Sequence, residues 1–331
     1  MPRSQGSFPW PVAPSFQDES RPVPAFTILR RSPKRGKPGR GVGVDLLAFC
    51  PRSGRGVKWG GGGEGAGTMI GINCGRLADL PALRDFAEVH GLGLELQEFA
   101  SPETLEGDWR ALIRRYRQAL AGFAGPISLH GPFVDLFSGS IDPRIAAVAM
   151  ERYRQAMEIA VELGAWLVNF HLNYNPLVDE PSYRPRWLER QAAFWSELAE
   201  EAQDAGVRIA LENMWEPDPF LQVEVIQRVN HLSIGACIDI GHAYLYSRVP
   251  IQAWINILEP ILIYVHLHNT NGIQDRHLPL SHGIIPIEPV LSRLVRCMNR
   301  PVLILELPGL AEIQESLPIL QRILQQTSAF P

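Results

Sequence analysis

Histidine is scarce in this sequence of 331 residues, yet four of its nine histidines lie in one short stretch, YVHLHNTNGIQDRHLPLSHG, at residues 264–283. The stretch completes an apolar run, so His266 and His268 end a segment that a folded chain would bury. Neutral imidazole is the commonest protein ligand for metals near pH 7. The crowding therefore suggests a metal site, and the simpler alternative is a set of solvated loop side chains.

Acidic residues and histidines also end most of the other apolar runs. Buried charges persist only when they are paired or bound to a metal. One such residue at the end of a run is usually structural, but six consecutive runs that end in this way indicate a shared cation. The residues concerned are Glu95 and Glu98, His130, His171, Glu212, Asp239 and His242, His266 and His268, and Glu306.

Eight short apolar runs carry these side chains, and stretches with helical spacing separate them. Nearly continuous apolar strands that alternate with helices are typical of a parallel sheet covered by helices. Eight such units match the size of a (β/α)₈ barrel, in which the carboxyl ends of the strands converge on one face. We therefore predict an α/β protein with a (β/α)₈ TIM barrel over residues 68–331. The runs span residues 69–75, 92–99, 126–132, 165–172, 208–214, 234–242, 261–268 and 301–307.

A doubly wound open sheet is the alternative fold, and it is disfavoured because no glycine-rich phosphate fingerprint follows the first run. The longest helical pattern follows the third run. Asp142 is its predicted N-cap, Pro143 its first residue and Gly164 its end, and Gly206 ends the next helix in the same way. The predicted buried face of the first of these helices consists of Ile145, Val148, Ala149, Ala156, Ile159 and Ala160.

Residues 1–67 differ in composition from the rest of the chain, because they are rich in Pro, Gly, Ser and Arg and carry a net charge of +7. Such a segment cannot bury enough apolar surface to offset its own ordering entropy. We therefore predict that residues 1–67 are a disordered basic segment. Residues 68–331 carry a net charge of −11, which makes nucleic acid a disfavoured partner for the barrel.

Composition also excludes some classes of function. No lysine follows Lys58, so the predicted barrel cannot form a Schiff base. The four cysteines form no CxxC pair, which favours reduced thiols. No run approaches the roughly 18 apolar residues of a membrane helix, and the N-terminus lacks an apolar signal core. We expect a cytoplasmic protein with no membrane partner, a small hydroxylated or phosphorylated substrate, and the capacity to form homo-oligomers.

The ligand types narrow the metal. Imidazoles mixed with carboxylates, without thiolates, suit Zn²⁺, Mn²⁺, Co²⁺ or Fe²⁺ rather than Ca²⁺. The residue pattern does not choose among these divalent ions.

Residues 69–331 resemble the xylose-isomerase-like TIM barrel superfamily, which includes sugar phosphate isomerases and epimerases and the AP endonucleases of the endonuclease IV type. The resemblance is carried by SLHGPF, VNFHLN, ALEN, CIDIGHA, VHLHN, DRHLPL and LILEL, in family order and spacing. The isomerase branch implies one divalent metal and proton transfer by two glutamates, with a contact from His242 to substrate. The implied ligands are Glu212, Asp239, His266 and Glu306, of which Glu212 and Glu306 move the proton.

The endonuclease branch implies three zinc ions, held by the same four positions together with His130, His171, His242, Asp275 and His277. All nine residues are present, which supports the superfamily more than either branch. The chain departs from the family at Ser281-His282-Gly283, where a Gly-Glu-Gly turn is frequent, and at Asn269, where many members have aspartate.

Three functions remain open. The first is a metal-dependent sugar or sugar-phosphate isomerase or epimerase, in which Glu212 and Glu306 transfer a proton beside a carbonyl. The second is a multi-zinc phosphoester hydrolase of the AP-endonuclease type, and the third is a non-catalytic sugar-binding barrel. The expected substrate contacts are Glu95, His130, His171, His242, His268 and Arg276.

Overall fold

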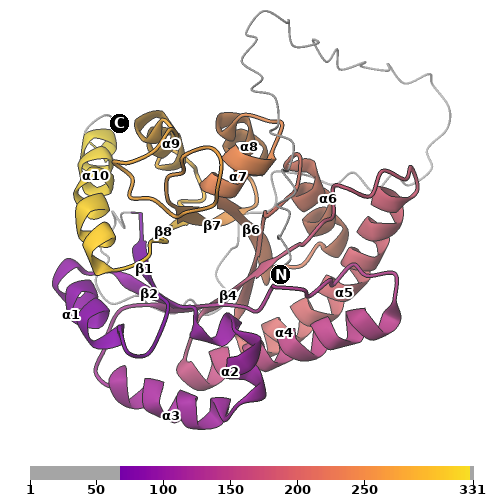
Figure 1. Cartoon of the computed structure of the whole chain (residues 1–331), viewed down its shortest axis with the longest axis horizontal. Helices are drawn as coiled ribbons and strands as arrows, with labels where there is room; N and C mark the ends of the chain where they lie inside the picture. Colours follow the sequence, from indigo (N-terminus) through magenta and orange to yellow (C-terminus); the bar gives the residue numbers. More distant parts are fainter. Residues whose placement is uncertain (1–67, 329–331) are drawn as a thin grey trace, which may run out of the picture. The chain divides into compact units, whose positions relative to one another are not determined.

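A computed structural model describes residues 68–328, in which eight parallel strands close into a barrel in chain order (Figure 1). Each strand pairs with the next, and β8 pairs with β1. The predicted (β/α)₈ barrel is therefore confirmed. The strands are β1 (Ile70–Cys74), β2 (Gly93–Leu96), β3 (Ile127–His130), β4 (Leu167–His171), β5 (Arg208–Glu212), β6 (Ile234–Asp239), β7 (Leu262–Leu267) and β8 (Val302–Leu305).

Helices surround the barrel, and none of those described is long and apolar enough to cross a membrane. All described residues belong to one compact unit, whereas the predicted disorder of residues 1–67 lies outside the described residues. The helices are α1 (Leu80–His90), α2 (Pro102–Glu106), α3 (Trp109–Ala119), α4 (Pro143–Leu163), α5 (Tyr183–Ala205), α6 (Phe220–Val229), α7 (Ile240–Tyr246), α8 (Ile251–Leu258), α9 (Ile287–Leu294) and α10 (Leu310–Ser328), with the short 3-10 helix η1 (Glu98–Ala100).

Helix α4 begins and ends as predicted, but its buried face is shorter than predicted. The side chain of Asp142 caps its N-terminus, and Gly164 ends it in the left-handed conformation at φ 69°. The buried positions begin at Ala149, whereas Ile145 and Val148 are 44% and 50% exposed. The prediction that these two residues are buried is wrong, because the first turn and a half of the helix lacks a covering layer.

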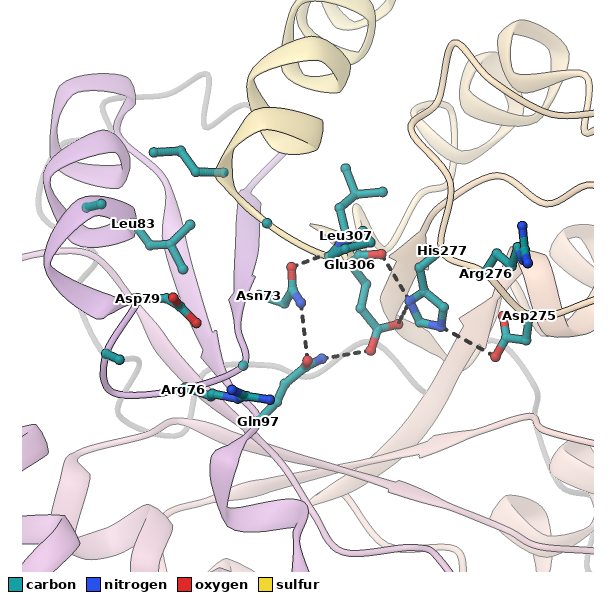
Figure 2. Close-up of a pocket in the computed structure, with 16 residues that line it drawn as sticks. Asn73, Arg76, Asp79, Leu83, Gln97, Asp275, Arg276, His277, Glu306 and Leu307 are labelled. Atoms are coloured by element: carbon teal, nitrogen blue, oxygen red, sulfur yellow. Dashed lines mark hydrogen bonds and ion pairs between the residues drawn. The ribbon is translucent and has the colours of Figure 1, made fainter.

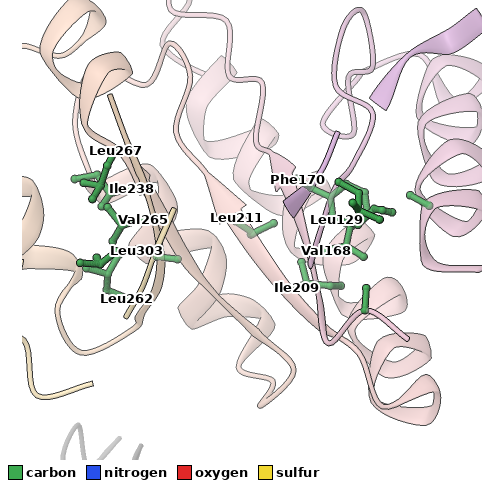
Figure 3. Close-up of a cluster of buried hydrophobic side chains, with 14 of the residues drawn as sticks. Leu129, Val168, Phe170, Ile209, Leu211, Ile238, Leu262, Val265, Leu267 and Leu303 are labelled. Carbon is green, nitrogen blue, oxygen red and sulfur yellow. The ribbon is translucent and has the colours of Figure 1, made fainter. Parts of the chain in front are cut away.

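Alternation along the strands explains where the core and the polar residues lie. Successive side chains on a strand point to opposite faces. In β4, Val168 and Phe170 join the core that includes helix residues, and Figure 3 shows them with equivalent residues of the neighbouring strands. Leu167 faces the barrel interior, with Tyr264 and Ile304, in a separate apolar cluster. The interior positions nearer the carboxyl ends are the polar ones, so the pleat itself gathers them.

Candidate metal centre

Four ligand atoms meet at the carboxyl ends of β5 to β8. Glu212 is the last residue of β5 and Asp239 the last of β6, while His266 lies near the end of β7 and Glu306 follows β8. One ligand atom from each of the four lies within 4.8 Å of the others, and all four side chains are buried. The structure thus brings together the four positions that the resemblance assigns to a single divalent metal.

His266 lies at the centre of this group, because both of its ring nitrogens face carboxylates. Its Nδ1 is 3.2 Å from Oε1 of Glu212 and 2.9 Å from Oε2 of Glu306. Its Nε2 is 3.0 Å from Oε2 of Glu95. Burial acts to lower the pKa of His266, but these three carboxylates raise it well above its ordinary value. In the metal-free chain a proton therefore supplies the positive charge that the carboxylates require.

A second group of donors lies on the other side of Glu212. Nε2 of His171 is 3.3 Å and Nε2 of His130 is 3.6 Å from Oε2 of Glu212. Burial lowers the pKa of His171 to about 3, so its imidazole is neutral and its lone pair can bind a cation. Burial would raise the pKa of Glu212, but His171 and His266 hold it well below its ordinary value. Glu212 therefore belongs to both donor groups as an ionised carboxylate.

A third group consists of His242, His268, Asp275 and His277. Nε2 of His242 is 2.9 Å and Nε2 of His277 is 3.4 Å from Oδ2 of Asp275. Nε2 of His268 lies 3.0 Å from both carboxylate oxygens of Asp239, which joins this group to the first. All nine positions that the resemblance assigns to metal binding thus lie in three adjoining groups.

Two buried atoms of the centre indicate that the residues fit a cation. Oε2 of Glu306 and Nδ1 of His171 have no hydrogen-bond partner among the described residues. Oε2 of Glu306 approaches His266 closely, but outside hydrogen-bonding geometry. A buried polar atom without a partner costs about 1–3 kcal/mol, and both of these atoms carry lone pairs. A divalent cation among these donors would satisfy them, and oxygen with imidazole nitrogen suits Zn²⁺, Mn²⁺ or Co²⁺.

Local backbone structure positions the third group. Asp239 ends β6 and caps α7, since its Oδ1 accepts a hydrogen bond of 2.7 Å from the backbone N–H of His242. Gly241 lies between them, and a Cβ atom at this position would lie 2.0 Å from Cε1 of His268. Only glycine therefore allows the His268 ring to approach Asp239 over the first turn of α7.

Asn269, which replaces the aspartate frequent in the family, holds the loop that follows β7. Its Nδ2 donates to the carbonyl oxygens of Leu280 and Ile285, each at 3.3 Å, and its Oδ1 accepts from the backbone N–H of Ile285 at 2.9 Å. His282 is largely exposed and lies 3.5 Å from Glu315. Neither Asn269 nor His282 belongs to a donor group in the described part of the chain.

Two cavities of about 750 and 350 Å³ open beside the donors, and both fall in the size range of small-molecule sites. Gln97, Asp275, His277 and Glu306 line both cavities, while His130, His171, Glu212 and His242 line the smaller one. Figure 2 shows His277 between Asp275 and Glu306, and Gln97 between Glu306 and Asn73.

The expected substrate contacts fall into two sets. His130, His171 and His242 line the smaller cavity, and Arg276 lines the larger one. Glu95 and His268 line neither cavity, and both are 0% exposed. The structure places these two behind the donors rather than against the space in which a substrate fits.

Three amide side chains are missing from the residues predicted for the site. Nε2 of Gln97 donates to Glu306 at 2.7 Å, and its Oε1 accepts from Asn73 at 3.2 Å. Nδ2 of Asn169 donates to Oε2 of Glu212. An amide does not titrate and is a common surface residue, so its only signal in the sequence is a position at the end of an apolar run.

Comparison with known proteins identifies the class to which this fold and site belong. The sequence model of the family described as xylose isomerase-like TIM barrel matches residues 86–323, so the chain belongs to that family. Its sequence is 30% identical over 210 residues to the uncharacterized protein MJ1311 of Methanocaldococcus jannaschii, which covers 60% of this chain and 70% of the relative.

Similar solved structures include enzymes described as sugar epimerases. The TTHB071 protein from Thermus thermophilus, after soaking with ZnCl₂, is 28% identical with a TM-score of 0.64, over 78% of this chain and 98% of that one. A D-tagatose 3-epimerase-like protein is 25% identical with a TM-score of 0.64, over 79% and 98%. An L-ribulose 3-epimerase, at 17% identity and a TM-score of 0.64 over 78% and 95%, shares the fold.

Proposed function

We propose that this protein is a divalent-metal-dependent isomerase or epimerase that acts on a sugar or a sugar phosphate. The observation that carries the proposal is the pair Glu212 and Glu306, which reach Nδ1 of His266 from different strands. Both carboxylates line the cavity of about 350 Å³, so a substrate held there contacts both. The neighbour described as D-tagatose 3-epimerase-like supports the same class of reaction.

Two carboxylates in one cavity suit a reaction that removes a proton and then returns it. One takes the proton from the carbon beside a carbonyl group, and the other returns a proton to a neighbouring atom or to the opposite face. Gln97 holds Glu306 and Asn169 holds Glu212, so both carboxylates are oriented before the substrate arrives. A divalent metal held by Glu212, Asp239, His266 and Glu306 would supply a Lewis acid for the substrate oxygens.

The larger cavity supports a phosphorylated substrate. Arg76 and Arg276 both line it, and neither side chain makes a hydrogen bond or ion pair with the residues that the structure describes. Asp79 also lines this cavity, which leaves the three side chains with a net charge of +1. We expect Arg276→Gln to lower kcat/KM for a sugar phosphate by at least tenfold and for the matching free sugar by much less.

Proton exchange tests the proposed function directly. The metal-loaded protein is incubated in D₂O with ketoses and their phosphates, and deuterium at the carbon beside the carbonyl is measured by NMR. Exchange should require Glu306 and Glu212 and should be lost in Glu306→Gln and Glu212→Gln. Glu98→Gln is the matched control, because Glu98 accepts from the backbone N–H of Leu77 away from the centre. No exchange with any ketose, together with phosphodiester cleavage, would refute the proposal.

The third donor group favours a second candidate, a multi-zinc phosphoester hydrolase. One metal needs only the first group, whereas His242, Asp275 and His277 add donors beside it. Metal analysis of the purified protein separates the two functions, since about one equivalent is expected for the isomerase and about three for the hydrolase. His277→Ala should then leave the metal of the isomerase bound and alter its substrate affinity, whereas it should remove metal from the hydrolase and reduce turnover.

A further inference from the structure

Glu95 is a buried carboxylate that the proposed reaction does not use. It is the third residue of the four in β2, it is 0% exposed, and it lines neither cavity. A carboxylate in such a place needs donors or positive charge around it. Its surroundings therefore show what it supports.

Three donors surround Glu95. Its Oε2 lies 3.0 Å from Nε2 of His266, and its Oε1 accepts from Nε2 of Gln97 at 3.0 Å. The hydroxyl of Tyr264 is hydrogen-bonded to Glu95 and lies 2.6 Å from the hydroxyl of Ser128. Both oxygens of the carboxylate are thus used as acceptors, and the contacts come from three other parts of the barrel.

The contact with His266 determines which ring nitrogen faces the donors. A neutral imidazole that donates from Nε2 keeps a lone pair at Nδ1, and Nδ1 is the nitrogen that faces Glu212 and Glu306. Metal-binding histidines usually donate their other ring N–H to a carboxylate, which fixes the tautomer and the ring orientation. Glu95 is the group in this position beneath His266.

The contact with Gln97 extends the same support to Glu306. Nε2 of Gln97 donates to Glu95 at 3.0 Å and to Glu306 at 2.7 Å. Its Oε1 is held by Asn73, which also accepts from the backbone N–H of Leu307 at 2.9 Å. One amide therefore ties Glu95 to a carboxylate of the proposed proton-transfer pair.

We propose that Glu95 is a positioning residue for the metal centre. It holds His266 as the Nε2–H tautomer with Nδ1 toward Glu212 and Glu306, and through Gln97 it orients Glu306. This inference rests on the metal centre of the proposed function, but not on the reaction that the centre performs. It replaces the expected substrate contact of Glu95 with a role in holding ligands.

The test is the affinity of the full-length protein for Co²⁺ and Zn²⁺, measured by competition with a chelating dye, with the absorption spectrum of the Co²⁺ form. In Glu95→Gln the new amide has only one acceptor oxygen, so it cannot accept from both His266 and Gln97. We expect affinity to fall about 10–100-fold and the Co²⁺ spectrum to change. Glu98→Gln is the matched control, which should keep the wild-type affinity and spectrum even if its melting temperature falls.

A second variant keeps the test decisive if Glu95→Gln does not fold. Tyr264→Phe removes one of the three donors to Glu95 and should weaken metal binding severalfold without altering the ligand set. Wild-type metal affinity and spectrum in either folded variant overturn the inference, and so does a Glu95→Gln enzyme that loses only sugar affinity. Failure of the proposed function looks different, because the wild type would then bind metal tightly and exchange no substrate proton.

Discussion

The stability of the metal-free protein should depend on pH through His277. Burial opposes protonation of this side chain, but Glu306 and Asp275 raise its pKa from 6.5 to about 9. A group whose pKa is higher in the folded state binds its proton more tightly there than in the unfolded chain. The stabilisation is therefore fully present below pH 6.5 and is lost as the pH rises through 9.

The size of the effect follows from the change in pKa. A rise from 6.5 to about 9 corresponds to about 3 kcal/mol. The side chain of His277 is 27% exposed, so solvent screening makes this figure an upper bound. In a domain of this size a loss of 1 kcal/mol lowers the melting temperature by about 2–4 °C. The largest contribution expected from His277 is therefore a fall of roughly 6–12 °C.

Thermal unfolding in the presence of a chelator measures this contribution, at pH values from 6 to 9.5. His130, His242 and His266 also have raised pKa values and change stability with the same sign. His277→Gln isolates one side chain, because only the difference between wild type and variant is compared. That difference should shrink from pH 6.5 to pH 9. A difference that is constant over this range would refute the reasoning, and one that grows would reverse its sign.

Three further results are expected. Gly241→Ala should cost about 1–3 kcal/mol and disturb metal binding, because its Cβ meets His268, whereas Gly164→Ala, whose Cβ meets nothing within 4 Å, should leave metal binding intact despite its left-handed backbone. Asn169→Ala should destabilise the protein by about 1.5–3 kcal/mol, since Glu212 loses a buried donor; an unchanged melting temperature would contradict this. Chelation should lower the melting temperature and abolish proton exchange, with recovery on adding Mn²⁺, Co²⁺ or Zn²⁺; full activity after exhaustive chelation would exclude a metal role.

The barrel and its donors were predictable because one physical pattern encodes both. A buried parallel strand shows as an apolar run, and its last interior position shows as a polar residue at the end of that run. His130, His171, Glu212 and Asp239 are each the last residue of their strand, as this pattern requires. The gathering of donors from distant parts of the chain then follows from closure of the barrel.

Depth inside the barrel was not predictable in the same way. Glu95 lies one residue before the end of β2, and Gln97 lies one residue after it. The residue that reaches the cavity from this strand is Gln97, while Glu95 remains below it. The end of an apolar run locates a strand terminus only within a residue or two, and one step reverses the face. A carboxylate and an amide two positions apart therefore exchanged their expected roles.

The balance of charge in the centre connects the number of metals to its protons. Glu95, Glu212, Asp239, Asp275 and Glu306 give five negative charges in a space that excludes most water. One divalent cation leaves three of these charges, so a one-metal centre keeps protons on nearby imidazoles, whereas three divalent cations need none. Binding of additional metal must therefore release protons that the first ion leaves in place. In the one-metal form the retained imidazolium groups beside the cavities are acids that a substrate oxygen can contact, which suits proton transfer on a sugar. The count of protons released for each metal bound thus reports which of the two chemistries the centre is arranged to perform.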